Sequence, residues 1–366
     1  MTVTASPTST AEVADVLRDA AAHGHTVVPT GRRTKLTWGM PTTPDVLLDL
    51  SGLDRVVDHQ AGDLIVEAQA GARLADVQDA VGRERQRLAL DETVPGGSVG
   101  GILATNASGP SRMQSGTARD LLIGVTVVRA DGVVAKAGGR VVKNVAGYDL
   151  GKLMVGSFGT LAVITSAVFR LHPLPDVRRW VSIDVDDPGR LHELAQAVIH
   201  SQTVPWAVEV DGSTLSVLLA GRADGVEVRV EAVRRLLGPD ATLADEPPAG
   251  WSSYPWSSGQ VGYKLTFALS GLGDVLATAR DAGVHVRGSA GVGVAYAAAD
   301  DATALERLRA VCALHGGTVV VVDAPDDVKR MVDVWGPVPA LDLMRRVKDQ
   351  FDPEHRLSPG RFVGGI

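Results

Sequence analysis

The sequence predicts an α+β protein of two domains. Its 366 residues exceed the roughly 150 that one domain typically contains. Helical and strand-like hydrophobic patterns alternate along the chain, and two stretches after residue 173 each show the order strand, helix, strand, strand, helix. That order predicts a smaller second domain, residues 173–335, built as an antiparallel sheet of two ferredoxin-like units with helices on one face.

The first domain, residues 1–172, is predicted to begin with a helix at 10–22, capped by Thr10 and ended by Gly24. The pair Asp131-Gly132 predicts a two-residue hairpin loop. The domain is expected to end before Pro173 and Pro175, because proline resists both helix and strand pairing. A second helix is expected at 72–84, a glycine-rich loop at 91–116, and strands at 25–29, 46–50, 55–59, 64–69, 121–130, 133–137 and 161–171.

The second domain is predicted to have a connecting loop at 241–260 between its two units. Its helices are expected at 188–200, 223–238, 271–282 and 301–314, and its strands at 178–186, 206–211, 214–220, 261–269, 284–287, 291–298 and 317–323. The last segment, 336–366, holds a helix near 340–350 and a tail rich in proline and glycine. We expect this segment to pack back toward the first domain, because it has no core of its own.

The composition excludes several classes of function. A net charge of −7 and an aromatic content of 4% disfavour a nucleic-acid binder. The single cysteine, Cys312, excludes an internal disulfide and any metal cluster held by several thiolates of this chain. The start of the chain lacks a signal-peptide pattern, and no run of 18 apolar residues occurs. We therefore expect a cytoplasmic protein without direct membrane insertion.

A basic loop directly follows the first predicted strand of the first domain. Glycine and small hydroxyl residues there let backbone N–H groups converge on an anion, and Arg32, Arg33 and Lys35 raise the local positive potential. Pyrophosphate fits such a loop, and the alternative is an exposed basic turn with no ligand. The candidate ligands are Pro29, Thr30, Gly31, Arg32, Arg33 and Thr34.

A glycine-rich stretch, residues 93–109, is the second candidate site. Without Cβ atoms, its backbone can lie flat against a large planar group, and the alternative is an irregular loop. Its candidate residues are Pro95, Gly96, Gly97, Ser98, Gly100, Gly101, Thr105, Asn106, Ser108 and Gly109. Two shorter segments add Gly116, Arg119 and Asp120, and then Gly159, Val163 and Ile164.

In this order and spacing, the four segments resemble the flavin-binding domain of the vanillyl-alcohol oxidase and p-cresol methylhydroxylase type, over about residues 10–172. The resemblance implies a two-part FAD-binding domain with the pyrophosphate at 30–34, the flavin along 97–101 and 105–109 with 116–120 nearby, and adenosine around 159–164. Thr34 stands where some family members link a histidine to the flavin, so the FAD is expected to be non-covalent. Arg33 replaces a usual glycine and adds a cation beside the phosphates.

Two further stretches, 138–153 and 351–362, resemble the 2-hydroxyacid branch of that family, especially the FAD-binding subunits of glycolate oxidase. The first contains Lys143 and Asn144, which are either ligands of the flavin or an anion, or loop caps. The resemblance implies a small 2-hydroxyacid substrate and, as partners, a larger flavoprotein subunit and an iron–sulfur subunit. Any association with a membrane would then run through those partners.

The run at 288–296 keeps the glycines of a family motif but lacks its metal-binding histidines, so no metal site is expected. A different base would have to serve, and the candidates are Tyr263, Lys264, Arg287 and Arg361, each with a packing or salt-bridge role as the alternative. Two other functions stay open: a non-catalytic FAD-holding assembly subunit, and a stand-alone FAD oxidase of a sugar or alcohol.

Overall fold

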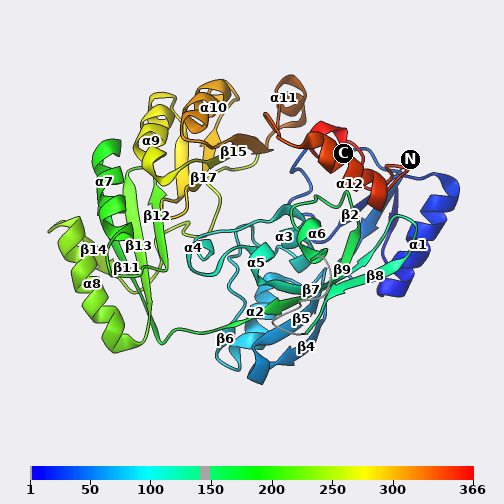
Figure 1. The fold of residues 1–366 in the computed structure, drawn as a ribbon, viewed down its shortest axis with the longest axis horizontal. Coiled ribbons are helices and arrows are strands. Elements are labelled where there is room, and N and C mark those ends of the chain that lie inside the picture. The colour runs from blue at the N-terminus through cyan, green and yellow to red at the C-terminus, as the bar shows by residue number, and fades with distance from the viewer. Residues whose placement is uncertain (1, 141–148) are drawn as a thin grey trace. The chain divides into compact units, whose positions relative to one another are not determined.

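The computed structural model describes residues 2–140 and 149–366. Its contacts form two compact units (Figure 1). Unit 1 comprises Met1–Ser108, Gly116–Leu174 and Val338–Ile366, and unit 2 comprises Gly109–Ser115 and Pro175–Pro337. The predicted divisions were at residues 172 and 335, and the small segment 109–115 was not expected to leave the first unit. No helix within the described residues is long and apolar enough to cross a membrane.

Unit 1 contains a parallel sheet in the order β1-β3-β2, an antiparallel sheet in the order β4-β5-β9-β7-β8, and the pair β6-β10. Its strands are β1 Val3–Ala5, β2 Val27–Thr30, β3 Val46–Asp49, β4 Val56–Gln60, β5 Ile65–Gln69, β6 Gln86–Arg87, β7 Leu122–Val128, β8 Val134–Gly138, β9 Val163–Arg170 and β10 His172–Pro173. Its helices are α1 Thr10–His23, α2 Leu74–Gly82, α3 Val99–Thr105, α5 Ala118–Leu121, α6 Gly151–Met154 and α12 Leu341–Phe351. The mixture confirms the α+β class.

Two local predictions in unit 1 need correction. Ser9, not Thr10, caps α1, because the Ser9 hydroxyl accepts from the Glu12 N–H at 3.2 Å. The β7–β8 loop has three residues rather than two. The Arg129 N–H donates to Val133 O, and Gly132, at φ +77°, donates back to Arg129 O. A turn followed by a residue in left-handed conformation extends the hairpin in this way.

The predicted loop at 91–116 is wrong over α3. Gly100 and Gly101 have low helix propensity, so the local pattern did not predict a helix there. The helix forms because Ser98 caps its start and because Ile102 and Leu103 are buried in the unit 1 core. The core next to α3 is tight, since a Cβ on Gly100 would lie 2.8 Å from the Cβ of Ala70.

Unit 2 is built on one antiparallel sheet in the order β14-β11-β13-β12-β16-β17-β15-β18. Helices α7 to α10 lie along one face of it, as predicted (Figure 1). The strands are β11 Val177–Asp184, β12 Ala207–Asp211, β13 Thr214–Gly221, β14 Thr242–Ala244, β15 Val261–Thr266, β16 His285–Ser289, β17 Val294–Ala299 and β18 Val319–Asp323. The helices are α4 Arg112–Ser115, α7 Pro188–Ile199, α8 Ala223–Leu237, α9 Leu272–Asp281, α10 Leu305–Leu314 and α11 Asp326–Met331.

The sheet of unit 2 consists of two halves with the same strand order read from the outer edge inward. One half runs β14-β11-β13-β12, the other runs β18-β15-β17-β16, and the halves meet at β12 and β16. The repeat of elements along the sequence is therefore a repeat in space. In the first half, β14 corresponds to β18, so the predicted connecting loop at 241–260 is wrong at residues 242–244.

Candidate functional site

A pocket open to solvent lies in unit 1 where β2, α3 and the segment before β9 come together. Twelve predicted cofactor residues line it: Pro29, Thr30, Gly31, Arg32, Arg33, Thr34, Ser98, Gly100, Gly101, Thr105, Gly159 and Ile164. The structure therefore brings residues from three of the four predicted segments to one cavity. The remaining lining residues are Lys35, Leu36, Leu50, Ala70, Ala104, Phe158, Ala162 and Arg361.

The arginines of the basic loop are engaged by protein oxygens. Arg32 donates from Nε to Gly71 O at 3.1 Å, and Arg33 forms an ion pair with Asp49 at 3.1 Å. Arg33 has φ +59°, the left-handed conformation in which a glycine would be unstrained. Arg33 thus adopts the backbone of the glycine it replaces and uses its guanidinium to hold the loop to β3.

Lys35 is the cation that sequence reasoning left out of the candidate ligands. It is only 6% exposed and lines the pocket. The Lys35 ammonium donates one hydrogen bond to Thr34 Oγ1 at 3.3 Å, and the centre of the Trp38 ring lies 6.0 Å from Lys35 Nζ. Burial lowers the pKa of Lys35 to about 8, although Glu92 opposes the shift. The sequence had marked Lys35 as a source of positive potential in the basic loop, but not as a ligand.

The start of α3 fits closely against the basic loop. Ser98 Oγ accepts from Gly101 N–H at 3.3 Å and caps the helix. A Cβ on Gly31 would lie 2.2 Å from that oxygen, so glycine is needed at this crossing. The two predicted segments therefore meet at Gly31 and Ser98, where a Cβ on Gly31 would displace the capping hydroxyl.

Arg361 lies in the pocket wall, and its guanidinium binds the basic loop. Its Nε donates to Trp38 O at 3.2 Å, and its Nη2 donates to Lys35 O at 3.1 Å and to Leu36 O at 3.2 Å. Burial lowers its pKa to about 10. It was predicted as a candidate base. The structure instead shows a positively charged side chain that fixes the course of residues 35–38.

Other predicted cofactor residues lie outside the pocket wall. Asp120 accepts from Thr117 N–H at 2.8 Å and caps α5, and a Cβ on Gly116 would collide with that carboxylate. The Val163 side chain is buried in the core, and Gly109 belongs to unit 2. Absent from the wall as well are Pro95, Gly96, Gly97, Asn106, Ser108 and Arg119. Lys143 and Asn144 lie outside the described residues.

The candidate bases of unit 2 lie on opposite faces of its sheet. Tyr263 is completely buried, its hydroxyl donates to Asp301 O at 3.0 Å, and burial raises its pKa to about 12. Lys264 and Arg287 are both paired across strands with Tyr296, so they share the other face. A phenol in the position of Tyr263 is a structural group and a poor base.

Arg287 is held in an ion-pair cluster on that face. It donates to Asp211 at 2.8 Å and to Gly250 O at 3.0 Å, and His285 contacts the same carboxylate at 2.7 Å. Burial opposes ionisation of Asp211, but the hydrogen bonds from His285 and Arg287 outweigh it and lower the Asp211 pKa. The charge of Arg287 is therefore balanced by Asp211, which indicates a structural role.

The part of the chain that the structure describes contains no arranged metal site and no reactive thiol. No group of three or more His, Cys, Asp or Glu side chains there is arranged to hold a metal ion. Cys312 is buried, and burial raises its pKa to about 12, which keeps the thiol protonated and unreactive. The pocket of unit 1 is thus the strongest candidate site.

Comparison with known proteins points to the same unit. The family model described as an FAD binding domain matches residues 1–138. Glycolate oxidase subunit GlcD of Bacillus subtilis (strain 168) is 28% identical over 62% of this chain and 49% of its own length. Subunit GlcE of Escherichia coli (strain K12) is 30% identical over 57% of this chain and 58% of its own length. The chain thus spans about half the length of these relatives.

A D-lactate dehydrogenase of Archaeoglobus fulgidus (strain ATCC 49558 / DSM 4304 / JCM 9628 / NBRC 100126 / VC-16) is 34% identical over 47% of this chain and 39% of its own length. Among solved structures, an alkyldihydroxyacetonephosphate synthase superposes with a TM-score of 0.72 at 15% identity, covering 97% of this chain and 75% of that one. At that identity the superposition supports the shared fold alone.

Proposed function

We propose that the chain, whose residues 1–138 match the family model of an FAD binding domain, holds FAD non-covalently in the pocket of unit 1 and oxidises small 2-hydroxyacids as the FAD-binding subunit of a glycolate oxidase-type complex. The observation that carries the proposal is the meeting of three predicted segments in one pocket of that unit. The relatives that act on glycolate and D-lactate support the substrate class.

The residues of the pocket suit FAD. The missing Cβ atoms of Gly31 and Gly100 let the basic loop pack against Ser98 and let α3 pack against Ala70, which brings these parts of the pocket wall together. The buried ammonium of Lys35 offers a cation to an anionic group of the cofactor. Near this wall, the buried Oδ1 of Asn106 has no hydrogen-bond partner among the described residues, so it can accept from an N–H group.

FAD would supply a two-electron acceptor that can pass electrons onward one at a time. The protein's part is to bind and orient it. Arg361 holds the carbonyls of the loop that contains Lys35, and its guanidinium carbon lies 5.9 Å from the centre of the Phe158 ring. Phe158 also stacks on Phe362 at 5.3 Å between ring centres, which gives this part of the wall an apolar surface that excludes water.

The partner subunits follow from the electron path. A 2-hydroxyacid gives up a hydride, and single electrons then need a carrier. With Cys312 as its only thiol, this chain does not supply the thiolates of an iron–sulfur cluster. We therefore assign the cluster to a partner subunit, together with a larger flavoprotein subunit.

Anaerobic reduction tests the proposal. Glycolate or D-lactate is added to the purified FAD-loaded chain, alone and with the partner subunits, and the visible flavin absorption is followed. Bleaching of the flavin of this chain is the expected result in either mixture. With partners present, the bleaching must exceed that of the larger subunit measured without this chain, and bleaching of this chain only with partners identifies the subunit role. Retention of the flavin band in both mixtures, with dithionite still able to bleach it, would contradict oxidation of these acids.

A second candidate is a subunit that holds FAD without turning over substrate. The run at 288–296, where glycines remain but histidine ligands are absent, favours it. Under this alternative, the chain retains bound FAD while glycolate and D-lactate bleach only the flavin of the larger subunit.

A further inference from the structure

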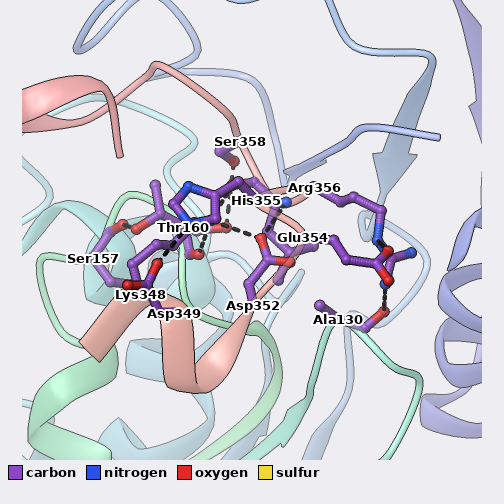
Figure 2. Close-up of polar contacts among 12 residues, drawn as sticks. Ala130, Ser157, Thr160, Lys348, Asp349, Asp352, Glu354, His355, Arg356 and Ser358 are labelled. Atoms are coloured by element: carbon purple, nitrogen blue, oxygen red, sulfur yellow. Dashed lines mark hydrogen bonds and ion pairs between the residues drawn. The ribbon is translucent and has the colours of Figure 1, made fainter. Parts of the chain in front are cut away.

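Lys348 of α12 ties the C-terminal segment to the loop before β9 (Figure 2). Its side chain is completely buried, at 0% exposure. Its Nζ donates to Thr160 O at 2.7 Å, to Asp352 Oδ2 at 2.7 Å and to Leu357 O at 3.0 Å. All three N–H groups of the ammonium therefore have acceptors, and one of them, Thr160 O, lies 188 positions away in sequence.

Asp352 completes this buried clasp. The same Oδ2 accepts from Leu357 N–H at 2.7 Å, and the carboxylate is as fully buried as its partner. Nearby, Ser358 Oγ donates to Gly159 O at 3.3 Å. The turn at 352–358 is thus fixed from within by the Lys348–Asp352 pair and attached to both Gly159 and Thr160.

The clasp continues into β2, which leads to the basic loop. Val27 N–H donates to Arg356 O and Ser358 N–H donates to Val27 O, both at 2.8 Å. Three residues after Ser358, Arg361 enters the pocket wall. The clasp therefore lies where β2, the Gly159 loop and Arg361 meet, although neither Lys348 nor Asp352 lines the pocket.

We propose that Lys348, with Asp352, is a positioning residue for FAD: the pair sets Gly159 and Arg361 at their places in the pocket wall, so that the FAD site includes the C-terminal segment. The family model matches residues 1–138, so the C-terminal segment lies outside the matched part of the chain. The inference rests on the proposed binding of FAD in this pocket and is independent of the substrate.

A purely structural role of the Lys348–Asp352 pair would affect stability and FAD affinity together. Removing one member of a buried ion pair leaves an uncompensated charge and lowers stability, whereas replacing both by apolar residues is often neutral. The double variant K348M/D352L carries no uncompensated charge and is expected to be more stable than K348M, while it still lacks the bonds to Thr160 and Leu357. If the clasp positions the wall, FAD affinity stays weak in this variant although its stability exceeds that of K348M.

The test uses the full chain freed of FAD. The variants are K348M and K348M/D352L, and D349N is the matched control, because Asp349 on the same helix pairs with His355 at 2.7 Å on the exposed surface. FAD affinity is measured by quenching of flavin fluorescence, and stability by the apo unfolding midpoint. We expect both Lys348 variants to weaken FAD binding about tenfold or more, since the loop loses its buried anchor, and D349N to match the wild type.

The inference is overturned if the double variant folds and binds FAD as tightly as the wild type. Should the variants not fold, hydrogen exchange of the wild-type chain decides: FAD is expected to increase protection at both 157–164 and 352–361. Protection confined to the first segment would also overturn it. A wild-type chain that takes up no FAD would contradict the proposed function as well, whereas FAD binding that ignores Lys348 refutes this inference alone.

Discussion

Arg361 Nη2 donates to the main-chain oxygen of Lys35 at 3.1 Å, although 326 positions separate the two residues in sequence. The contact joins the end of the chain to the loop that follows β2. Because both residues line the pocket, the guanidinium fixes the backbone from which the Lys35 ammonium extends. The candidate site thus depends on a bond between two segments of unit 1 that lie far apart in sequence.

Arg361→Met should lower the stability of unit 1 by about 2–4 kcal/mol, because three carbonyl oxygens lose a charged donor in a buried place. The apolar replacement keeps most of the side-chain volume. Denaturant unfolding of the FAD-free chain measures the change. Arg346→Met, an exposed substitution on α12, is the control and should change stability little. Equal stabilities for the two variants would contradict the positioning role of Arg361.

Gly31→Ala should weaken FAD binding and cost about 1 kcal/mol of stability, since the new methyl group displaces the Ser98 hydroxyl from its cap on α3. Thermal unfolding and FAD titration measure the two effects. In a Ser98→Ala background the stability cost of Gly31→Ala should shrink, because the cap is already lost. Gly62→Ala is the control, as nothing lies within 4 Å of its added Cβ.

Lys35 predicts a specific pH dependence. Its pKa is about 8 in the folded chain against 10.5 for an ordinary lysine. Between these values the unfolded chain binds more protons, so the stability of the FAD-free protein should rise with pH across that window. Lys35→Met should remove the rise and stabilise the FAD-free protein at neutral pH by about 1–3 kcal/mol. Unfolding midpoints measured across that window check both expectations.

FAD binding should show the opposite trend. A protonated Lys35 attracts an anionic cofactor, so wild-type affinity should fall as pH rises above about 8, while Lys35→Met binds weakly at every pH. Titrations at several pH values measure this, and Lys136→Met, which alters an exposed lysine, is the control. Parallel pH profiles for the wild type and Lys35→Met would exclude the ammonium from FAD binding.

Sequence reasoning identified those parts of the site that depend on backbone shape. Gly31 and Gly100 stand where a Cβ has no room, and such positions leave a local signature in the sequence. The pocket residues Leu50, Ala70 and Ala162 leave none, because ordinary packing between distant strands brings them to the wall. Nothing local shows which alanine of a strand will face a cavity.

The fold, too, was predictable from the sequence where local patterns determine it and not where distant segments pair. Alternating patterns predicted the α+β class and the strands of unit 2 other than β14, since each pattern reflects one buried face. The pairing of β12 with β16, which joins the two halves of the sheet, depends on edges meeting in space and has no local pattern. Helix α3 was missed because tertiary burial of Ile102 and Leu103 overrides the weak helix propensity of its glycines.

The clasp at Lys348 also has a consequence for how the chain folds during synthesis. Residues 348–361 are synthesised after all of unit 2. The pocket of unit 1 therefore cannot be completed on the ribosome until these residues emerge and contact the rest of the unit. Unit 2, whose main part is continuous in sequence, can fold first. Closure of unit 1 then joins segments far apart along the chain, a slow kind of step. Loading of FAD is therefore expected to follow synthesis of residues 348–361.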